Sequence, residues 1–341
     1  MRAMVLSAYK RLEVRDVPPP AAGESDVLVR VKACGICGSD VHGYDGSTGR
    51  RIPPLVMGHE AAGVVERVGR VVEDLRPGDR VTFDSTVSCG RCPSCREGRT
   101  NLCPSRRVVG VSCGEYRQDG AYAEYVSVPR HIVHRLPDGL PFEHAAMVEP
   151  VAVAVHAVGR VRERPRSAVV VGTGTIGLLV IQVLRAGGCE QIVAVEVDEG
   201  KRALARAVGA DLALDPRSAD VAAEVAGRTG GGADVALECV GASEPVQTAV
   251  ASVRRGGAVV LVGNVTPSVP LPLQVVVANE ITLLGTCASS GEYPRAIELL
   301  GTGAVDVRPL ISLVAPLEEG PALFERLHAR ESGLLKVVLR P

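Results

Sequence analysis

"VVVGTGTIGLLVIQVLRAGG", residues 169–188, decides the fold of the middle of this chain. An apolar strand-like run leads into three glycines spaced G-x-G-x-x-G, and an apolar helix-forming run follows. A glycine pattern placed between a strand and a helix is the context in which it binds a dinucleotide. Gly172 would permit the tight turn, Gly174 would let the backbone approach a pyrophosphate, and Gly177 would let the helix pack close to the strand. The pyrophosphate would lie against the free N–H groups at the start of the helix.

The residues around this turn predict which dinucleotide binds. Thr175 and Ile176 lie between the second and third glycines and belong to the predicted cofactor site. Glu196 follows Gly177 by nineteen residues, at the end of the next strand-like run, where a carboxylate accepts hydrogen bonds from the adenosine ribose. Because this carboxylate would repel a 2′-phosphate, we expect NAD to be preferred over NADP, with Arg202 nearby able to soften the preference. The alternative is a glycine-rich turn that binds no ligand.

Short apolar runs alternate with Ala- and Leu-rich segments across the middle of the chain. The runs are 168–172, 191–197, 212–215, 234–240, 258–263 and 281–286. Near-continuous apolar strands separated by helices predict a parallel sheet covered on both faces. Six such strands make one doubly wound dinucleotide-binding domain, so the predicted fold class is α/β.

The chain before this region has a different composition and hydrophobic pattern. It is rich in Cys, His, Pro and Gly and holds short alternating runs such as 26–33 and 61–69, which indicate an irregular, mostly β domain. After the last apolar run come two helical segments and a closing strand, "LLKVVL", which we expect to return to the first domain. The predicted division is a first domain over 1–152, a dinucleotide-binding domain over 153–286, and a return to the first domain over 287–341.

The composition argues against several classes of partner. The formal net charge is −1 and the longest basic clusters are two residues long, which gives no reason to expect nucleic acid or an acidic membrane as a partner. The first residues, "MRAMVLSAYKRLEVRDVP", lack the apolar segment of a signal peptide, and no run of 18 apolar residues occurs. We therefore expect a cytoplasmic protein without a membrane span, in which thiols stay reduced.

Four cysteines gather in a short segment, "CGRCPSCREGRTNLC". Cys89, Cys92, Cys95 and Cys103 have the spacing C-x2-C-x2-C-x7-C. Four thiolates fit a closed tetrahedral zinc site, which leaves no position for substrate and is therefore structural. Disulfides, a redox-active C-x-x-C pair and an iron–sulfur cluster are the alternatives. The reducing compartment disfavours disulfides, and a single cluster next to a dinucleotide-binding domain favours zinc over iron and sulfur.

A second group of metal-binding residue types is spread over "CGICGSDVH", "GHE" and "MVEP". A thiolate, an imidazole and carboxylates together suit a zinc ion with an open position, as catalysis requires. Taken singly, each residue has an ordinary explanation, such as a small buried cysteine or a surface carboxylate. The group consists of Cys37, Ser39, Asp40, His42, His59, Glu60 and Glu149.

Together these motifs resemble the zinc-dependent medium-chain dehydrogenase/reductase family of alcohol and polyol dehydrogenases, over essentially the whole chain. The resemblance implies a GroES-like, mostly β catalytic domain interrupted by a Rossmann domain. It implies one catalytic and one structural zinc in each subunit, with NAD as the cofactor. Members of the family are usually dimers or tetramers, and segment 269–285 lies where their Rossmann sheets join. We therefore expect a homodimer or homotetramer.

The resemblance also assigns roles to the second group. Cys37 and His59 are implied to be ligands of the catalytic zinc, and Glu60 a direct or exchanging ligand. Glu149 stands where alcohol dehydrogenases have a cysteine, and would bind zinc directly or through its water, as on the sorbitol, threonine and butanediol dehydrogenase side of the family.

Three further residues of this group have implied roles around the metal. Asp40 resembles the carboxylate that orients the ligand histidine. Ser39 and His42 resemble a proton relay, and the near-neutral pKa of an ordinary histidine suits its outer end.

The implied reaction is oxidation of a secondary alcohol to a ketone with hydride transfer to NAD. A polyol of the sorbitol or L-iditol type is the first expectation, with 2,3-butanediol or L-threonine as alternatives. The arginine–tyrosine pair of animal-type sorbitol enzymes is replaced here by Ala288 and Ser289, which indicates a roomier, less polar pocket. Other classes are an inactive NAD-binding zinc protein, a zinc-free quinone reductase and a nucleic-acid-binding zinc module. None of these needs both cysteine groups together with the glycine motif.

Overall fold

The computed structural model describes residues 1–161 and 163–341 and divides into two compact units. The first unit comprises Met1–Glu149, Tyr293–Gly301 and Leu310–Pro341. The second unit comprises Pro150–Glu292 and Thr302–Pro309. Within the described residues, no helix combines the length and apolar character that a bilayer-spanning segment needs.

The second unit is built on a six-stranded sheet in the order β15-β14-β13-β16-β17-β18, with all neighbouring strands parallel. This is the strand order of a doubly wound dinucleotide-binding fold, and it confirms the predicted α/β class. The strands are β13 (Ser167–Val171), β14 (Gln191–Val195), β15 (Leu212–Leu214), β16 (Ala233–Glu238), β17 (Val253–Leu261) and β18 (Thr282–Gly285). The helices are α4 (Val148–Gly159), whose first two residues belong to the first unit, α5 (Thr175–Ala186), α6 (Glu199–Ala207), α7 (Val221–Thr229), α8 (Ser243–Ser252) and α9 (Leu273–Ala278).

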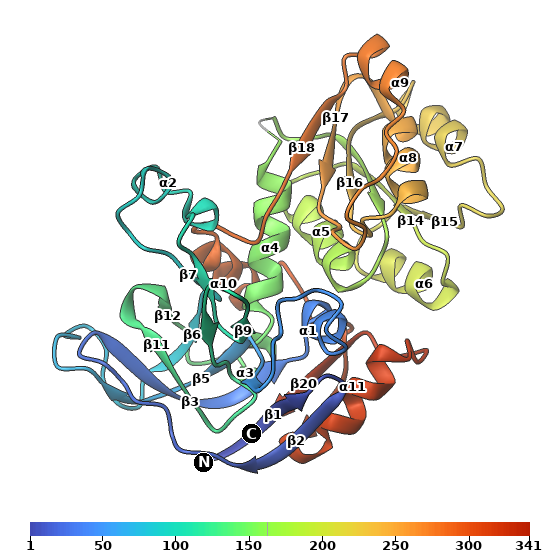
Figure 1. Ribbon diagram of the computed structural model, residues 1–341. Coiled ribbons are helices and arrows are strands. Elements are labelled where there is room, and N and C mark those ends of the chain that lie inside the picture. Colours follow the sequence, from blue (N-terminus) through green and yellow to red (C-terminus); the bar gives the residue numbers. More distant parts are fainter. Residues whose placement is uncertain (162) are drawn as a thin grey trace. The chain divides into compact units, whose positions relative to one another are not determined.

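Helices cover both faces of this sheet because each strand-to-strand connection is a crossover. Helices α5 and α6 contact one another and pack on β14, while α7 and α8 contact one another and pack on β16. Figure 1 shows β16 and β17 lying between α5 and α8. Every residue of β13 is buried, which explains why this strand is a continuous apolar run. Strand β17 begins at Val253, before the predicted Ala258, because Val253 already pairs with Ala233; the register then shifts, and regular pairing resumes with Ala258 opposite Val235.

The first unit is mostly β. Its largest sheet has seven strands in the order β12-β6-β5-β3-β20-β19, with β11 also paired to β3. Strands β2-β1-β4 form a second sheet, and β9-β10 and β7-β8 form pairs. The strands are β1 (Arg2–Ala8), β2 (Arg11–Asp16), β3 (Asp26–Gly35), β4 (Leu55–Val56), β5 (Glu60–Val68), β6 (Arg80–Phe83), β7 (Thr86–Val87), β8 (Arg107–Val108), β9 (Val111–Ser112), β10 (Arg117–Gln118), β11 (Tyr125–Pro129), β12 (Val133–Arg135), β19 (Ile311–Pro316) and β20 (Lys336–Arg340).

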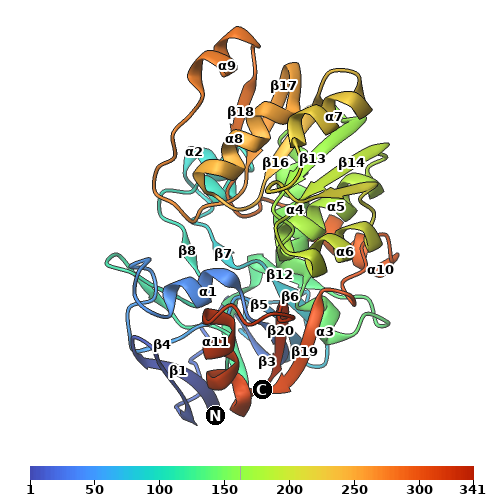
Figure 2. The same cartoon turned by 90° about the vertical axis from the view of Figure 1, so that its right-hand side faces the viewer.

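The end of the chain completes the large sheet of the first unit. Strand β20 pairs antiparallel with β3 and parallel with β19, so residues from the two ends of the sequence lie side by side (Figure 2). The core under this sheet includes Tyr122 and Phe324, whose rings meet edge to face at 5.7 Å. The α-helices of this unit are α1 (Gly38–Gly43), α2 (Pro93–Arg96), α3 (Phe142–Ala145), α10 (Tyr293–Gly301) and α11 (Gly320–His328), and short 3₁₀ turns occupy Thr100–Leu102, Arg130–Ile132 and Leu317–Glu319.

Candidate functional site

Two neighbouring strands of the first unit bring Cys37, His59 and Glu60 together. Cys37 follows the end of β3 as the N-cap of α1, while Glu60 opens β5 directly after His59. The strands are antiparallel, and Gly35 is paired with Glu60. One donor atom from each of the three side chains lies within 4.8 Å of the other two. The pairing of β3 with β5 therefore joins two motifs that are separate in the sequence.

The chemistry of this group fits a bound zinc ion. His59 and Glu60 are buried, and burial followed by the charge of Glu60 raises the pKa of the Cys37 thiol. A metal cation would offset this effect and stabilise the thiolate. Nδ1 of His59 lies 3.5 Å from Oδ2 of Asp40, which leaves Nε2, on the other side of the ring, for a metal. Sulfur, nitrogen and oxygen donors in one buried cluster are a zinc ligand set.

Glu60 is held by an ion pair with Lys336. The Lys336 Nζ lies 2.7 and 2.9 Å from the two carboxylate oxygens and donates to the carbonyl oxygen of Ile36 at 3.0 Å. The two side chains are only 1% and 3% exposed, so each charge depends on the other. Lys336 was not predicted as a site residue, although a lone charge in the apolar strand "LLKVVL" is a signal for a buried partner.

Glu149 lies in the first turn of α4 and outside the group of three donor atoms that lie within 4.8 Å of one another. Ser85 Oγ donates to its Oε1 at 3.4 Å. Burial raises the pKa of Glu149 to about 7. The structure therefore gives this chain two carboxylates of different character: Glu60 is buried and fixed by a cation, and Glu149 is half-buried and held by a hydroxyl.

Asp40 is fully buried on α1 and is surrounded by donors. It accepts hydrogen bonds from Arg51 Nε and from the Tyr122 hydroxyl, both at 2.8 Å. Burial alone would raise the pKa of Asp40, but the charges of His59 and Arg51 and the bonds from Arg51 and Tyr122 hold it below its usual value. Asp40 is thus an ionised carboxylate beside His59, as the resemblance implied. Arg51 and Tyr122 were not foreseen, since only the folded chain brings them here.

Ser39 and His42 lie one turn apart on the exposed side of α1. The Ser39 hydroxyl donates to Cys37 Sγ at 3.3 Å and accepts from Arg51 Nη2 at 3.3 Å. The carbonyl oxygen of His42 accepts from Ser47 Oγ at 2.8 Å, while its side chain is exposed. The structure thus places a hydroxyl next to the candidate metal ligands and an imidazole in contact with solvent.

The four cysteines of the loop around α2 also converge. One sulfur from each of Cys89, Cys92, Cys95 and Cys103 lies within 4.8 Å of the others. The Cys92–Cys95 and Cys89–Cys95 sulfur distances are 3.4 and 3.9 Å, too long for the bond of about 2.05 Å in a disulfide. Backbone N–H groups lower the pKa of Cys89 to about 6. The loop thus presents four clustered sulfur ligands of a closed zinc site.

In the second unit, the glycine motif forms the predicted turn between β13 and α5. Gly172 has φ of +88°, and a Cβ there would lie 2.4 Å from Val240 Cγ2. A Cβ on Gly177 would lie 1.9 Å from the carbonyl oxygen of Gly172. A Cβ on Gly174, by contrast, would meet no atom within 4 Å. At Gly172 and Gly177 the close packing therefore leaves no room for a side chain, whereas Gly174 borders open space at the N-terminus of α5. Thr175 and Ile176 are the first two residues of this helix.

Glu196 lies just past β14 and next to this turn. Its Oε2 accepts from Thr173 N at 2.9 Å, and its Oε1 accepts from Val197 N at 2.9 Å. Arg202 Nη1 donates to the carbonyl oxygen of Glu196 at 2.7 Å and lies 3.1 Å from Asp215 Oδ2. Arg202 is buried, so its guanidinium braces the loop after β14, while the Glu196 carboxylate lies beside the glycine turn.

Glu238, at the end of β16, is a further residue that the sequence analysis missed. It pairs with Val171 at the end of β13 and is fully buried. Its carboxylate accepts from Val240 N at 2.7 Å and Gly241 N at 2.8 Å. This fixes the turn whose Val240 side chain fills the space beside Gly172. A lone Glu in the apolar run "DVALECV" was the available signal.

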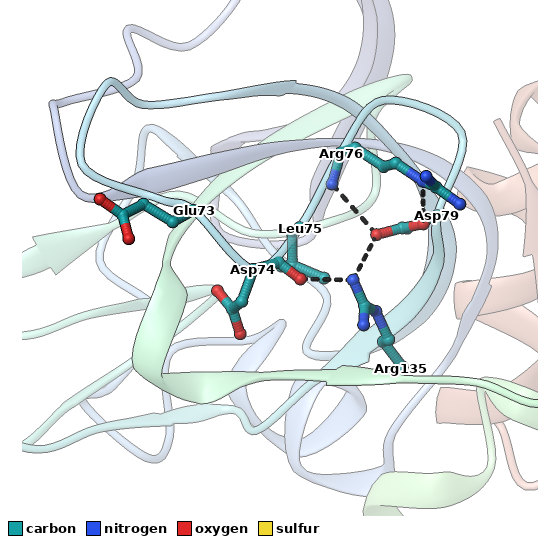
Figure 3. A pocket seen from close by; sticks show the side chains of 6 residues that line it. All are labelled: Glu73, Asp74, Leu75, Arg76, Asp79 and Arg135. Carbon is teal, nitrogen blue, oxygen red and sulfur yellow. Dashed lines mark hydrogen bonds and ion pairs between the residues drawn. The ribbon is translucent and has the colours of Figure 1, made fainter.

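A surface hollow of about 540 Å³ in the first unit involves a different set of residues. Figure 3 shows Asp79 between Arg76 and Arg135. Arg135 Nη2 lies 2.9 Å from Asp79 Oδ2, and the same oxygen accepts from Arg76 N at 3.0 Å. The lining is Glu73, Asp74, Leu75, Arg76, Asp79 and Arg135. Asp79 already pairs with both arginines. None of the lining residues belongs to the candidate metal or dinucleotide sites, so the hollow is not part of either site.

Two known domain patterns match this chain. Residues 23–138 match the pattern of the alcohol dehydrogenase GroES-like domain, and residues 175–302 match that of zinc-binding dehydrogenases. Sorbitol dehydrogenase of Bacillus subtilis is 34% identical over 347 residues, covering 100% of this chain and 97% of the relative.

Solved structures share the fold over the whole chain. A zinc-binding dehydrogenase from Sinorhizobium meliloti bound to NADP is 36% identical with a TM-score of 0.92, covering 100% of this chain and 99% of that one. The 2R,3R-butanediol dehydrogenase of Bacillus subtilis is 32% identical with a TM-score of 0.90 and the same coverage. The chain therefore belongs to the zinc-dependent medium-chain dehydrogenase family, as an oxidoreductase that acts on CH–OH groups.

Proposed function

We propose that this chain is an NAD-dependent polyol dehydrogenase that oxidises a secondary alcohol of the sorbitol or L-iditol type to the ketone. The observation that carries the proposal is the group formed by the half-buried Cys37 with the buried His59 and Glu60, supplemented by the Glu149 carboxylate. The 34% identity with the sorbitol dehydrogenase of Bacillus subtilis supports the substrate class.

Cys37 and His59 would hold the catalytic zinc, with a carboxylate as the third protein ligand. Bound there, zinc supplies a Lewis acid that polarises the substrate hydroxyl and lowers its pKa. Glu60 uses both oxygens on Lys336, whereas Glu149 receives one hydrogen bond of 3.4 Å from Ser85. Glu149 therefore loses fewer existing interactions than Glu60 would when it binds a cation. We propose Glu149 as the carboxylate ligand at rest, directly or through water.

The chain's own residues would move the hydroxyl proton. Ser39 Oγ lies 3.3 Å from Cys37 Sγ, so a substrate hydroxyl held near the ligands is within its reach. Ser39 accepts that proton and passes its own toward His42, whose exposed imidazole can exchange protons with solvent. Asp40 keeps the ring of His59 oriented throughout.

NAD is the proposed cofactor, and it supplies the hydride acceptor. The N-terminus of α5 and Gly174 would face the pyrophosphate, and Glu196 would accept from the ribose hydroxyls. The carboxylate of Glu196 disfavours a 2′-phosphate. The NADP bound to the Sinorhizobium meliloti relative makes the comparison of both cofactors the informative test.

A small diol is the second candidate substrate. Ala288 and Ser289 replace the larger polar pair of animal-type sorbitol enzymes, and a solved relative is a 2R,3R-butanediol dehydrogenase. With less side-chain polarity to recognise the far hydroxyls of a sugar alcohol, a shorter diol becomes a reasonable competitor.

We also propose that the chain forms a homodimer or homotetramer. Strand β18 is the last strand of its sheet, and the adjoining helix α9 exposes Leu273 and Val277 by 63% and 67%. An open sheet edge beside exposed apolar side chains favours association.

NADH formation by the zinc-loaded protein tests the function. The panel is sorbitol, xylitol, myo-inositol, 2,3-butanediol, L-threonine and ethanol, each with NAD and with NADP. We expect chelator-sensitive oxidation of a polyol with NAD, and its loss in Cys37→Ala. Activity confined to butanediol would select the second candidate, and full activity of Cys37→Ala would refute the zinc site.

A further inference from the structure

Arg51 lies outside every motif of the sequence analysis, yet its side chain contacts two of the predicted catalytic residues. Its Nη2 lies 2.7 Å from Asp40 Oδ1 and donates to Ser39 Oγ at 3.3 Å, while its Nε donates to the same Asp40 oxygen at 2.8 Å. The side chain is only 5% exposed. One buried guanidinium thus joins the carboxylate beside His59 to the hydroxyl of the proposed relay.

The surrounding chain is shaped to admit this arginine. A Cβ on Gly43, the last residue of α1, would lie 2.3 Å from Arg51 Cγ. The backbone at Arg51 forms a bridge to Ser112, and Arg51 Nη1 donates to the carbonyl oxygen of Arg50 at 3.0 Å. The position of the Arg51 side chain is therefore fixed by its backbone bridge, by the absence of a side chain at Gly43 and by hydrogen bonds, independently of any substrate.

The contact determines how Ser39 can form hydrogen bonds. A serine hydroxyl has one hydrogen and two lone pairs, whereas a guanidinium only donates and stays protonated. Arg51 occupies one lone pair of Ser39, and the O–H points to Cys37 Sγ. One lone pair remains, and it can accept only from a further donor such as a substrate hydroxyl.

We propose that Arg51 is a positioning residue for proton removal from the alcohol; the inference rests on the proposed function. It holds Ser39 with a lone pair open to the substrate. Its permanent positive charge disfavours a second proton on the Ser39 oxygen, so Ser39 releases its own proton as it takes the proton of the alcohol. The substrate O–H bond breaks as an O–H bond to Ser39 forms, and the original Ser39 proton passes on toward His42. The alcohol carbon is oxidised by loss of hydride to NAD, and Arg51 keeps its charge and all its protons.

Replacement of Arg51 by lysine is the sharpest test. Lysine keeps a charge for the buried Asp40, but its single ammonium lacks the planar fork whose separate nitrogens hold Asp40 and Ser39 in fixed directions. We expect kcat on the best alcohol of the panel to fall about 10-fold, which is less than the roughly 10²–10⁴-fold contribution of a proton-transfer group itself, because Ser39 and His42 remain in place. The bound zinc and the KM for NAD should change less than about 2-fold, and the solvent deuterium isotope effect on kcat should rise, because proton transfer becomes slower than the other steps.

Two further variants test whether a loss of kcat comes from the position of the Arg51 side chain or from a general effect of substitution in this loop. Gly43→Ala keeps every charged group but forces the Arg51 side chain to move, so it should reproduce the loss of kcat. Arg50→Met removes the neighbouring exposed arginine and should leave kcat and the isotope effect unchanged.

Three outcomes separate the inference from the proposed function. Wild-type kcat and isotope effect in both Arg51→Lys and Gly43→Ala would overturn the inference while leaving the proposed function intact. Loss of zinc in step with activity would also overturn it, because Arg51 would then serve only Asp40 and His59. An unmodified, zinc-loaded protein that oxidises no alcohol would defeat the proposed function itself, and the inference with it.

Discussion

Replacing Lys336 by methionine leaves the Glu60 carboxylate buried without its cation. The ammonium lies 2.7 and 2.9 Å from the two carboxylate oxygens, and the side chains are 3% and 1% exposed. Two unit charges about 2.8 Å apart attract by about 6 kcal/mol at an effective dielectric constant of about 20. Desolvation offsets part of this attraction, and removal of one partner from a buried pair costs about 3–5 kcal/mol. We expect the free energy of unfolding to fall by that amount.

The assay is urea unfolding of the zinc-loaded protein, followed by far-UV circular dichroism. With an m-value of about 3 kcal/mol/M, a loss of about 4 kcal/mol lowers the midpoint by about 1 to 1.5 M. The matched control is Arg340→Met on the same strand, which removes an exposed pair with Glu143. An exposed pair contributes about 0–1 kcal/mol, so the control midpoint should shift by less than about 0.3 M.

A double-mutant cycle identifies the cause. In Lys336→Met combined with Glu60→Gln, neither buried charge remains, and we expect more than half of the lost stability to return. If Lys336→Met and Arg340→Met shift the midpoint equally, or if the double variant is less stable than Lys336→Met alone, the ion pair is not what stabilises this part of the sheet.

Three further predictions concern the other sites. Gly177→Ala should weaken NAD binding by more than about 10-fold in calorimetry, because its Cβ would lie 1.9 Å from the Gly172 carbonyl oxygen; unchanged affinity would contradict the proposed turn. Cys92→Ser should reduce the zinc content measured by metal analysis from two ions to one and lower the midpoint of thermal unfolding. The control variant Cys113→Ser should keep both ions. Two bound ions in Cys92→Ser would exclude the four-thiolate site. Glu196→Ala should narrow the preference for NAD over NADP at least about 10-fold in kcat/KM, and an unchanged ratio would remove Glu196 from cofactor selection.

The sequence by itself determined the features that are encoded over short distances. The α/β class follows from apolar runs separated by helical segments, and the strand order of the second unit confirms it. The four cysteines of the α2 loop lie within fifteen residues, so local turns alone bring their sulfurs together. The glycine turn is likewise local, because the packing of Gly177 against Gly172 spans five residues.

Only the tertiary structure decided which charges support the metal group. Lys336 and Glu60 are 276 residues apart, Tyr122 and Asp40 are 82 apart, and Arg51 reaches Asp40 past the bare Cα of Gly43. The meeting of Lys336 with Glu60 depends on the pairing of β20 with β3 and of β3 with β5. Tyr122 is placed by backbone hydrogen bonds with Met4 and Met57, and Arg51 by its bridge to Ser112. A lone lysine or arginine in the sequence is ordinarily a solvated surface charge. Once buried, each of these charges is needed for stability, because a charge removed from water is stable only beside an opposite charge. Which residue supplies that opposite charge is decided by the folded chain.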